Sequence, residues 1–184
     1  MRQRFDKILV SFAVLVVCLP FIASDLIAIQ VTGSLARGIY IQSDIDTQLK
    51  PGDIVSVSFR SENIAERPNV YPLPDNLPWC SFIKVIGGVP GDQIDITKDK
   101  LFINGLYAGP IHSKDSKGRP LSRAMTGRYH LQKDWYVVTT PHHRSYDSRY
   151  YGPVHISQLK IATPLWLLPT DTPFSGKEDI YGQR

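Results

Sequence analysis

The chain is organised around the stretch Val31-Thr-Gly-Ser-Leu-Ala-Arg-Gly-Ile-Tyr-Ile41. This stretch begins where the only long apolar run of the sequence ends. Within it Ser34 follows a glycine, and Thr32 stands two positions earlier. After it the sequence changes to short segments rich in β-branched and aromatic residues, separated by glycine and proline, which is typical of strands and turns. The stretch therefore joins an apolar N-terminal segment to a β-rich remainder.

The apolar segment predicts a membrane anchor. Residues 8–23 are almost entirely apolar, and after Ser24 and Asp25 the apolar character resumes through Ile29. About 20 helical residues cross a bilayer core, so we expect one transmembrane helix over residues 8–29. Residues 1–7 are basic and should stay in the cytoplasm, because positive charge favours that side. The remainder then lies on the periplasmic (extracytoplasmic) face of the cytoplasmic (inner) membrane. A secretory signal cleaved near Ala23 is the alternative.

The length and composition of the chain suit one folded domain. The 184 residues predict an ectodomain over residues 30–168 and a polar tail over residues 169–184. The net charge of +4 is most simply explained by solubility, although a basic surface also favours anionic lipid. No dense basic block with interleaved aromatics is present, so we expect no nucleic-acid partner. Cys18 and Cys80 form no CxxC pair, and we expect neither a metal centre nor another cofactor.

The ectodomain pattern is mainly β. Leu49-Lys-Pro-Gly-Asp53 predicts a type II turn, and Asn104-Gly105 predicts a tight hairpin turn. No helical period is evident after the anchor. Strands are expected at residues 39–41, 54–59, 81–86, 93–96, 101–103, 135–139, 154–156 and 159–161. These segments predict an antiparallel, barrel-like sheet that curls on itself.

Lys84 is the one charged residue of the strand expected over residues 81–86. Side chains two positions apart share a face of a strand, so Phe82, Lys84 and Ile86 should lie together. If that face is buried, desolvation disfavours the ammonium form. The lysine pKa can then fall from about 10.4 to roughly 7–8, and the amine becomes a general base. The commoner alternative is a lysine whose stem packs while its ammonium reaches water.

Ser34 and Thr32 are candidates for the complementary chemistry. A nucleophilic serine should be exposed on a tight turn and activated by an adjacent base. The Thr32 hydroxyl and the Ser34 backbone N–H can together donate to the oxyanion of a tetrahedral intermediate. The alternatives are ordinary: most Gly-Ser turns only bond the local backbone, and Thr32 can be a β-branched residue entering a strand.

Ser145, Asp147 and Arg149 alternate, so they would share a face of an extended segment. Asp147 and Arg149 suit an ion pair that fixes local geometry, and Ser145 suits a hydrogen bond that orients the Lys84 amine. A Ser34–His143–Asp147 triad is a less favoured alternative, because it leaves Lys84 unexplained. No HExxH helix is present, and we expect no metal site.

Together these motifs resemble the type I signal peptidase family of membrane-bound serine–lysine proteases, and within it the conjugative-transfer signal peptidases of the TraF type. The similarity runs from the anchor to about Trp166. Its motifs are Thr32-Gly-Ser34 with Gly38-Ile-Tyr40, Pro51-Gly-Asp53, Ile83-Lys-Val-Ile-Gly87 with Pro90-Gly-Asp92, Ser145-x-Asp147-Ser-Arg149-Tyr-x-Gly152-Pro153, and Ala162-Thr-Pro-Leu-Trp166.

The resemblance implies a role for each matching residue. Ser34 would be the nucleophile, Lys84 the general base and Thr32 an oxyanion donor. Ser145 would orient the lysine, while Asp147 and Arg149 brace the site. The implied reaction removes a leader peptide from an exported precursor through an acyl-enzyme, next to membrane lipid. For TraF-type members the substrate would be a pilin precursor, and attack by its own amine would give a cyclic product.

The chain departs from the family pattern in ways that favour a specialised enzyme. Ala36 stands where many members have proline, and His142-His143 replaces the Gly-Asp-Asn lead-in of general leader peptidases. The segment between Lys84 and Ser145 is too short for the extra domain of the large secretory enzymes. Two alternatives stay open, namely a general secretory leader peptidase and a non-catalytic assembly protein of a transfer apparatus.

Overall fold

The structure is a computed structural model that describes residues 26–58, 81–121 and 126–169. The expected cytoplasmic segment, most of the expected anchor, residues 59–80 of the expected ectodomain and the tail from residue 170 lie outside these ranges. The described elements are β1 (Ile27–Gln30), β2 (Gly38–Ser43), β3 (Ile54–Ser58), β4 (Ser81–Gly88), β5 (Gln93–Ile96), β6 (Lys100–Ile103), β7 (Leu106–Pro110), β8 (Gly127–His130), β9 (Trp135–Thr139), α3 (Ser148–Tyr151), β10 (Val154–His155), the 3₁₀ helix η1 (Ile156–Gln158) and β11 (Leu159–Leu167). None of the helices in the described ranges is long and apolar enough to cross a membrane.

The larger sheet confirms the mainly antiparallel β prediction. Its strand order is β1-β2-β11-β3-β4-β9-β10, and every described neighbouring pair is antiparallel. The central strands β3 and β4 are rich in β-branched residues, and Val55, Val57, Ile83 and Val85 are completely buried. Residues 55–57 and 83–86 are all buried, polar Ser56 and Lys84 included, so both faces of these central strands are covered by the rest of the protein.

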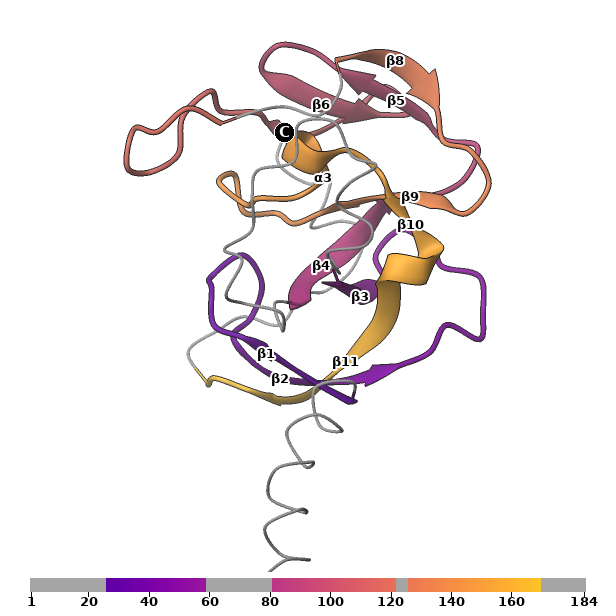
Figure 1. Ribbon diagram of the computed structural model, residues 1–184, viewed down its shortest axis with the longest axis vertical. Coiled ribbons are helices and arrows are strands. Elements are labelled where there is room, and N and C mark those ends of the chain that lie inside the picture. The colour runs from indigo at the N-terminus through magenta and orange to yellow at the C-terminus, as the bar shows by residue number, and fades with distance from the viewer. Residues whose placement is uncertain (1–25, 59–80, 122–125, 170–184) are drawn as a thin grey trace, which may run out of the picture.

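This sheet curls on itself, and the curl brings β1 close to β4. The two strands are in contact although β2, β11 and β3 lie between them in the sheet order. Strand β11 makes the bend, because its first residues pair with β3 while the later ones pair with β2, with a register shift between Pro164 and Trp166. Figure 1 shows β1, β2 and β11 crossing below β3 and β4. In the described ranges no pairing joins β1 to β10, so the sheet is curled without being closed.

The inside of the curl is a small apolar core that joins distant parts of the chain. Its buried members are Ala28, Leu35, Tyr40, Ile83, Val85 and Ala162. These residues come from β1, the turn after it, β2, β4 and β11. The core therefore fixes the turn that carries Ser34 against the strand that carries Lys84.

The smaller sheet has the order β7-β6-β5-β8 and lies above the larger one in Figure 1. The strands expected over residues 93–96 and 101–103 are present as β5 and β6, and they pair as an antiparallel hairpin. Asn104 and Gly105 join β6 to β7 with φ angles of 51° and 78°, as a type I′ turn requires. Ile94 and Ile103 of this sheet pack with Val137 of β9 and with Tyr150 of α3.

The predicted type II turn before β3 is also confirmed. Gly52 has a φ of 103°, which suits the third position of that turn, and the Asp53 N–H donates to the Lys50 carbonyl over 3.1 Å.

Three expectations need correction. Ile27–Gln30, whose first three residues were assigned to the end of the anchor, form strand β1, so the expected helix cannot extend to Ile29. The physical reason is the alternation of exposed and buried residues, which lets β1 pair with β2. The strand expected over residues 154–156 ends at His155, and η1 begins at Ile156. The short helix α3 was not expected, because four residues are too few to show a helical period.

Candidate active site

Lys84 lies at the centre of β4, paired with Val55 of β3. Its side chain shares a face with Phe82, as the alternation predicted, and Nζ lies 5.7 Å from the centre of that ring. Only 3% of the residue is exposed. Burial lowers the pKa of Lys84 to about 8, while nearby Asp147 raises it in part and Arg149 lowers it further. A substantial fraction of a group with this pKa is neutral near pH 8, so Lys84 can accept a proton there.

The hydrogen bond expected between Lys84 and Ser145 is present. Lys84 Nζ donates to Ser145 Oγ over 3.2 Å, and the two residues are 61 positions apart in the chain. Ser145 is itself buried. The contact holds the amine in one direction within a region that excludes most water.

Asp147 and Arg149 form a buried ion pair beside this contact. Arg149 Nη2 lies 2.6 Å from Asp147 Oδ2, and Arg149 Nε donates to Asp147 Oδ1 over 2.8 Å. The two side chains are 1% and 0% exposed, respectively. The two parallel bonds are the bidentate geometry that guanidinium and carboxylate groups prefer.

The same arginine holds the backbone around Ser145. Its guanidinium donates to the carbonyls of His142, His143, Ser145 and Pro110 over 3.0, 3.4, 3.3 and 3.3 Å. These bonds satisfy a buried cation and fix the segment that presents the Ser145 hydroxyl to Lys84.

The grouping of Ser145, Asp147 and Arg149 was expected, but the geometry behind the expectation was wrong. The segment is not extended. Asp147 is the N-cap of α3, and its Oδ1 accepts the Arg149 backbone N–H over 3.1 Å. A side chain that caps the first turn can also reach the residue two positions later, so the cap rather than strand alternation brings Asp147 and Arg149 together.

Ser34 lies on the turn after β1 and is partly exposed. Its Oγ lies 3.2 Å from the Oγ1 of Thr32. Thr32 is exposed, so its hydroxyl is available to a ligand on the outer side of the turn. The structure therefore brings together the two hydroxyls singled out in the sequence.

Gln30 also belongs to this group, and the sequence analysis missed it. Its Nε2 donates to Ser34 Oγ over 3.0 Å and to Thr32 Oγ1 over 2.9 Å. The residue sits at the end of β1 at a buried position. The signal that could have pointed to it is a polar glutamine at the end of an apolar run, four residues before a candidate nucleophile.

The two halves of the site come together through packing rather than through a hydrogen bond. Leu35, next to Ser34, packs in the same core as Ile83 and Val85, the residues on either side of Lys84. In the described ranges the hydrogen bonds of Ser34 Oγ go to Gln30 and Thr32, and that of Lys84 Nζ goes to Ser145. The structure thus describes no hydrogen bond between Ser34 and Lys84.

The alternative triad is not assembled. Both carboxylate oxygens of Asp147 accept from Arg149. The ring of His143 instead stacks on His142, with centroids 5.0 Å apart, and lies edge-on to His112. Within the described ranges no group of three or more His, Cys, Asp and Glu residues is arranged to hold a metal ion.

The fold and the site together define a β-rich hydrolase candidate with a threonine and a serine hydroxyl on one side and a buried lysine on the other. The model of the signal peptidase family, peptidase S26, matches residues 3–165. The chain therefore belongs to this family of serine endopeptidases, which remove leader peptides from exported proteins and are typically membrane-associated.

The chain was also compared with solved structures and with curated protein sequences. The chain is similar to a signal peptidase I from Enterococcus faecalis V583 at 22% identity and a TM-score of 0.33, with 65% of this chain and 98% of that chain covered. No protein among the curated sequences matches this chain. Membership of the family rests on the family match alone.

Proposed function

We propose that this chain is a membrane-anchored serine endopeptidase that uses Ser34 as nucleophile and Lys84 as general base to remove leader peptides from exported precursors. The observation that carries this proposal is the state of Lys84. Its amine is buried, its pKa is lowered to about 8, and it donates a hydrogen bond to Ser145. A lysine that served only to solubilise the sheet would keep its ammonium in water.

In the proposed first step, the Ser34 Oγ attacks the carbonyl carbon of the scissile peptide bond and its proton passes to the neutral Lys84 amine. The Lys84 ammonium then gives that proton to the leaving amine, and an acyl-enzyme on Ser34 remains. Water, activated by Lys84 in the same way, releases the acyl group. Because Ser34 now bonds Gln30 and Thr32, its hydroxyl must turn toward Lys84 when substrate binds. Catalytic hydrogen bonds often tighten only in the substrate complex.

The position of Thr32 supports the proposed oxyanion role. Its hydroxyl lies beside Ser34 Oγ, and the residue is exposed to an incoming substrate. The oxygen that becomes negative in the tetrahedral intermediate would accept from the Thr32 hydroxyl and from the Ser34 backbone N–H. Ser145 would direct the Lys84 amine, and the pair of Asp147 and Arg149 would hold Ser145 in place.

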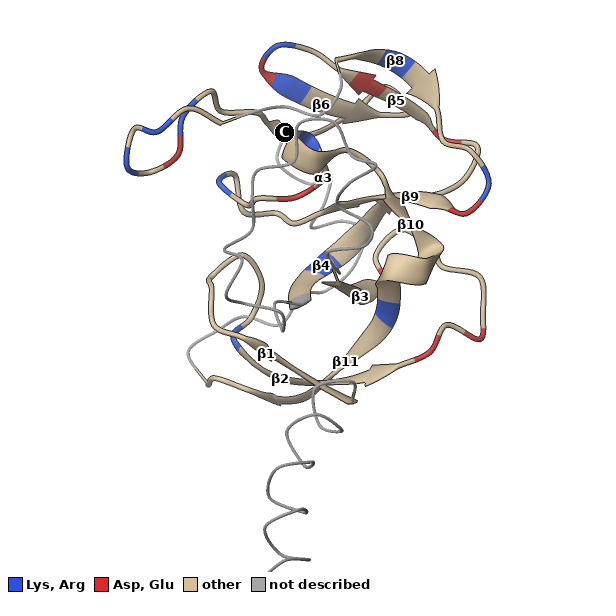
Figure 2. Ribbon diagram, viewed as in Figure 1, with Lys and Arg blue, Asp and Glu red and all other residues tan. Residues whose placement is uncertain are grey.

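An exposed apolar surface supports membrane lipid as a partner of this enzyme. Strands β1 and β2 contain no charged residues, and Figure 2 shows the charges concentrated elsewhere. Ile29 is 65% exposed and Val31 74% exposed, close to Ser34 in the chain. The other large exposed apolar residues of β1, β2, β11 and their ends are Leu26, Ile27, Ile41, Leu165 and Trp166. An apolar surface beside the expected anchor suits a single-pass enzyme whose catalytic domain rests on the extracytoplasmic face of the membrane.

For the substrate we propose a pilin-type precursor of a conjugative transfer system, with cyclisation as a further outcome of the acyl-enzyme. The support is the resemblance of the motifs to TraF-type members and the short span of 61 positions between Lys84 and Ser145. Cyclisation requires the pilin itself to be the acyl group, so Ser34 would cut at the C-terminal end of the pilin and the peptide beyond the cut would leave as the amine. The N-terminal amine of the pilin would then attack the acyl carbon in place of water. A new peptide bond would close the ring, and Ser34 would leave as the hydroxyl.

The test is mass spectrometry of exported small proteins from cells carrying the wild type, Ser34→Ala or Lys84→Ala. We expect one precursor, or a few, to accumulate uncut in both variants. A cyclic product would appear only with the wild type, and its mass would be lower than that of the linear product by one water. Processing at the wild-type rate in either variant would overturn the catalytic assignment in favour of an assembly protein.

A second arm separates the specialist from a general secretory enzyme. The gene is expressed in cells depleted of their own leader peptidase. We expect no rescue of growth, because a specialist should not cut the general precursors. Rescue would show the general function.

A further inference from the structure

Among the residues that the structure describes, Gln30 is the buried polar side chain that reaches both hydroxyls of the candidate site. Its Nε2 lies 2.8 Å from the Thr32 backbone carbonyl oxygen, 2.9 Å from Thr32 Oγ1 and 3.0 Å from Ser34 Oγ. The residue is 6% exposed, whereas Thr32 lies at the surface. The amide thus approaches both hydroxyls from the protein side of the turn.

The Thr32 carbonyl fixes which end of the amide faces the hydroxyls. A backbone carbonyl oxygen only accepts hydrogen bonds, so the Gln30 atom 2.8 Å from it has to be the nitrogen. The usual uncertainty between the oxygen and nitrogen of a glutamine is therefore resolved by this contact. The nitrogen has two hydrogens and three acceptors within reach, so at least one hydrogen is shared between two acceptors, as in a three-centre hydrogen bond.

Because the Gln30 Nε2 can only donate, it determines the direction of the hydrogens on the Thr32 and Ser34 hydroxyls. Each hydroxyl that accepts from Gln30 keeps its own hydrogen for another acceptor, and in the structure without substrate one of the two donates to the other over 3.2 Å. With substrate bound, Thr32 would donate to the developing oxyanion and Ser34 to the Lys84 amine. A hydrogen bond donated to Ser34 Oγ also stabilises negative charge on that atom as its proton leaves.

We propose that Gln30 is a positioning residue, whose carboxamide orients the Thr32 and Ser34 hydroxyls for oxyanion binding and proton transfer. The inference rests on the proposed peptidase function for its catalytic meaning. The contact with residue 34 can be tested without any peptidase activity.

The direct test is a thiol titration. In a chain with Cys18→Ser and Cys80→Ser, Ser34→Cys places one thiol at the nucleophile position, and its pKa is read from the ultraviolet absorbance of the thiolate. Removing the donor with Gln30→Met should raise the thiol pKa by roughly one unit, and Gln30→Glu should raise it further because it adds a negative charge. Gln30→Glu also keeps nearly the original side-chain volume, so it carries the comparison if Gln30→Met does not fold.

Gln42→Met is the matched control. Gln42 is 5% exposed and lies in β2, four residues along the strand from Gly38, the register partner of Gln30. At about 3.3 Å per residue this is roughly 13 Å away. The control variant should leave the thiol pKa unchanged. An unchanged thiol pKa in both Gln30 variants, or an equal shift in the control, overturns the inference.

The kinetic arm uses the full-length membrane protein with Ser34 intact. Gln30→Met should lower kcat roughly ten- to a hundredfold with KM within about twofold, since the lost bonds act in the transition state. Gln30→Glu should be slower still, and Gln42→Met should match the wild type. Wild-type kcat in both Gln30 variants would overturn the positioning role. If the wild type itself cuts no precursor while the thiol pKa still responds to Gln30, the peptidase proposal fails and the contact stands.

Discussion

The two halves of the candidate site are built in opposite ways. Lys84 and Ser145 are both 3% exposed, and the contact between them joins positions 61 residues apart. On the other half, the hydroxyls of Thr32 and Ser34 lie on a surface turn, and their bonds with Gln30 span at most four residues. The tertiary structure therefore sets the properties of the lysine, whereas the local chain sets those of the hydroxyls.

This difference divides the chemical work. The lowered pKa of Lys84 needs a dry environment, which only packing from several elements provides. The nucleophile needs to meet a substrate and to change partners during the reaction, which a turn at the surface allows. Changes in the lysine half should therefore alter stability and pH dependence as well as rate, and changes to the two exposed hydroxyls should alter rate alone.

The strongest test of this contrast is Lys84→Met. We expect kcat to fall by at least roughly a thousandfold, because the proposed general base is lost. The protein should nevertheless become more stable at pH 7, by up to about 3 kcal/mol, since a buried ammonium is replaced by an apolar side chain. Thermal unfolding and precursor cleavage measure the two effects on the same preparation.

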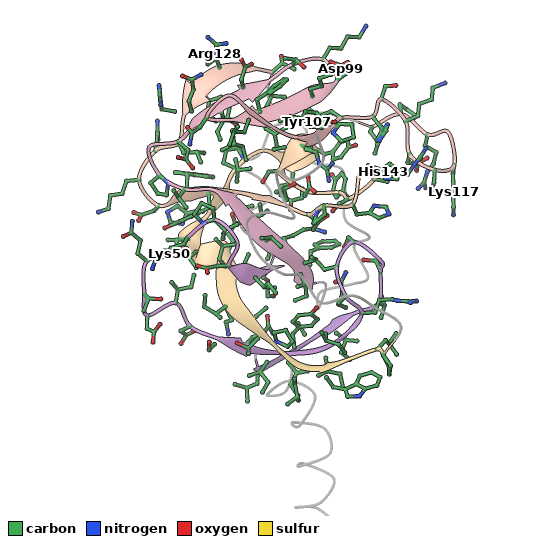
Figure 3. The ribbon with its side chains drawn as sticks, turned by 180° about the vertical axis from the view of Figure 1, so that it is seen from behind. Lys50, Asp99, Tyr107, Lys117, Arg128 and His143 are labelled. Atoms are coloured by element: carbon green, nitrogen blue, oxygen red, sulfur yellow. The ribbon has the colours of Figure 1, made fainter. Side chains whose placement is uncertain are left out.

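The pH dependence of that stability gain follows from the pKa of Lys84. The pKa is about 8 in the folded chain against an ordinary value of 10.5, so the folded state binds fewer protons between these values. The destabilisation by Lys84 is complete below pH 8 and disappears above pH 10.5. The advantage of Lys84→Met should shrink over this interval. Lys50→Met, at an exposed turn (Figure 3), should show neither effect. A constant gain, or a loss of stability at pH 7, would contradict the buried-lysine account.

The second test compares a buried ion pair with an exposed one. Arg149→Met leaves the Asp147 carboxylate buried without its partner and should cost about 3–5 kcal/mol of stability. Arg128→Met removes the 2.8 Å pair with Asp95, in which the Arg128 side chain is 69% exposed. Figure 3 shows Arg128 pointing outward from the smaller sheet. That variant should cost less than about 1 kcal/mol. Similar losses in chemical denaturation would show that Arg149 does not hold the lysine half together.

The contrast also explains what the sequence could predict. The face of Lys84 followed from alternation in a strand, and the closeness of Thr32 and Ser34 followed from a spacing of two residues, because both are local properties. The turns at Gly52 and Asn104 were predicted for the same reason. The mainly antiparallel fold followed from the many short β segments between them.

Some features that the sequence did not predict depend on contacts between distant segments. Others lie in elements too short to show a helical or strand period. Strand β1 continues an apolar run, and composition alone does not separate such a strand from the end of a helix. The sequence therefore placed Gln30 directly after the anchor, and its contact with the candidate nucleophile was not predicted. Asp147 and Arg149 were paired by alternation, whereas the cap of a four-residue helix brings them together. The burial of Lys84 depends on how the sheets pack, which no local pattern contains.

In the hydroxyl half, Thr32→Val should affect rate alone. The variant keeps the β-branched shape and removes the donor, so kcat should fall roughly ten- to a hundredfold with little change in KM. The unfolding temperature should stay close to that of the wild type, since Thr32 is exposed. Thr32→Ser, which restores the hydroxyl, should recover most of the rate. Equal rates for the valine and serine variants would remove Thr32 from the oxyanion role.

The smallest expected effect belongs to Ser145→Ala, and it tests whether the lysine half is tuned by a single contact. Ser145 Oγ accepts from Lys84 Nζ, which favours the charged amine, so its loss should lower the pKa of Lys84 by less than about one unit. The rising limb of the kcat/KM profile against pH should then move to lower pH, while kcat falls roughly three- to tenfold because the amine is less well directed.

Ser148→Ala is the matched control for this last comparison. Ser148 is equally buried, but its hydroxyl accepts from the Val138 backbone N–H over 2.9 Å rather than from Lys84. Its loss should reduce stability by about 1 kcal/mol and leave the pH profile in place. A profile that moves equally in both variants would mean that the proton affinity of Lys84 responds to the packing of the whole segment, and that the bond to Ser145 has no special part in it.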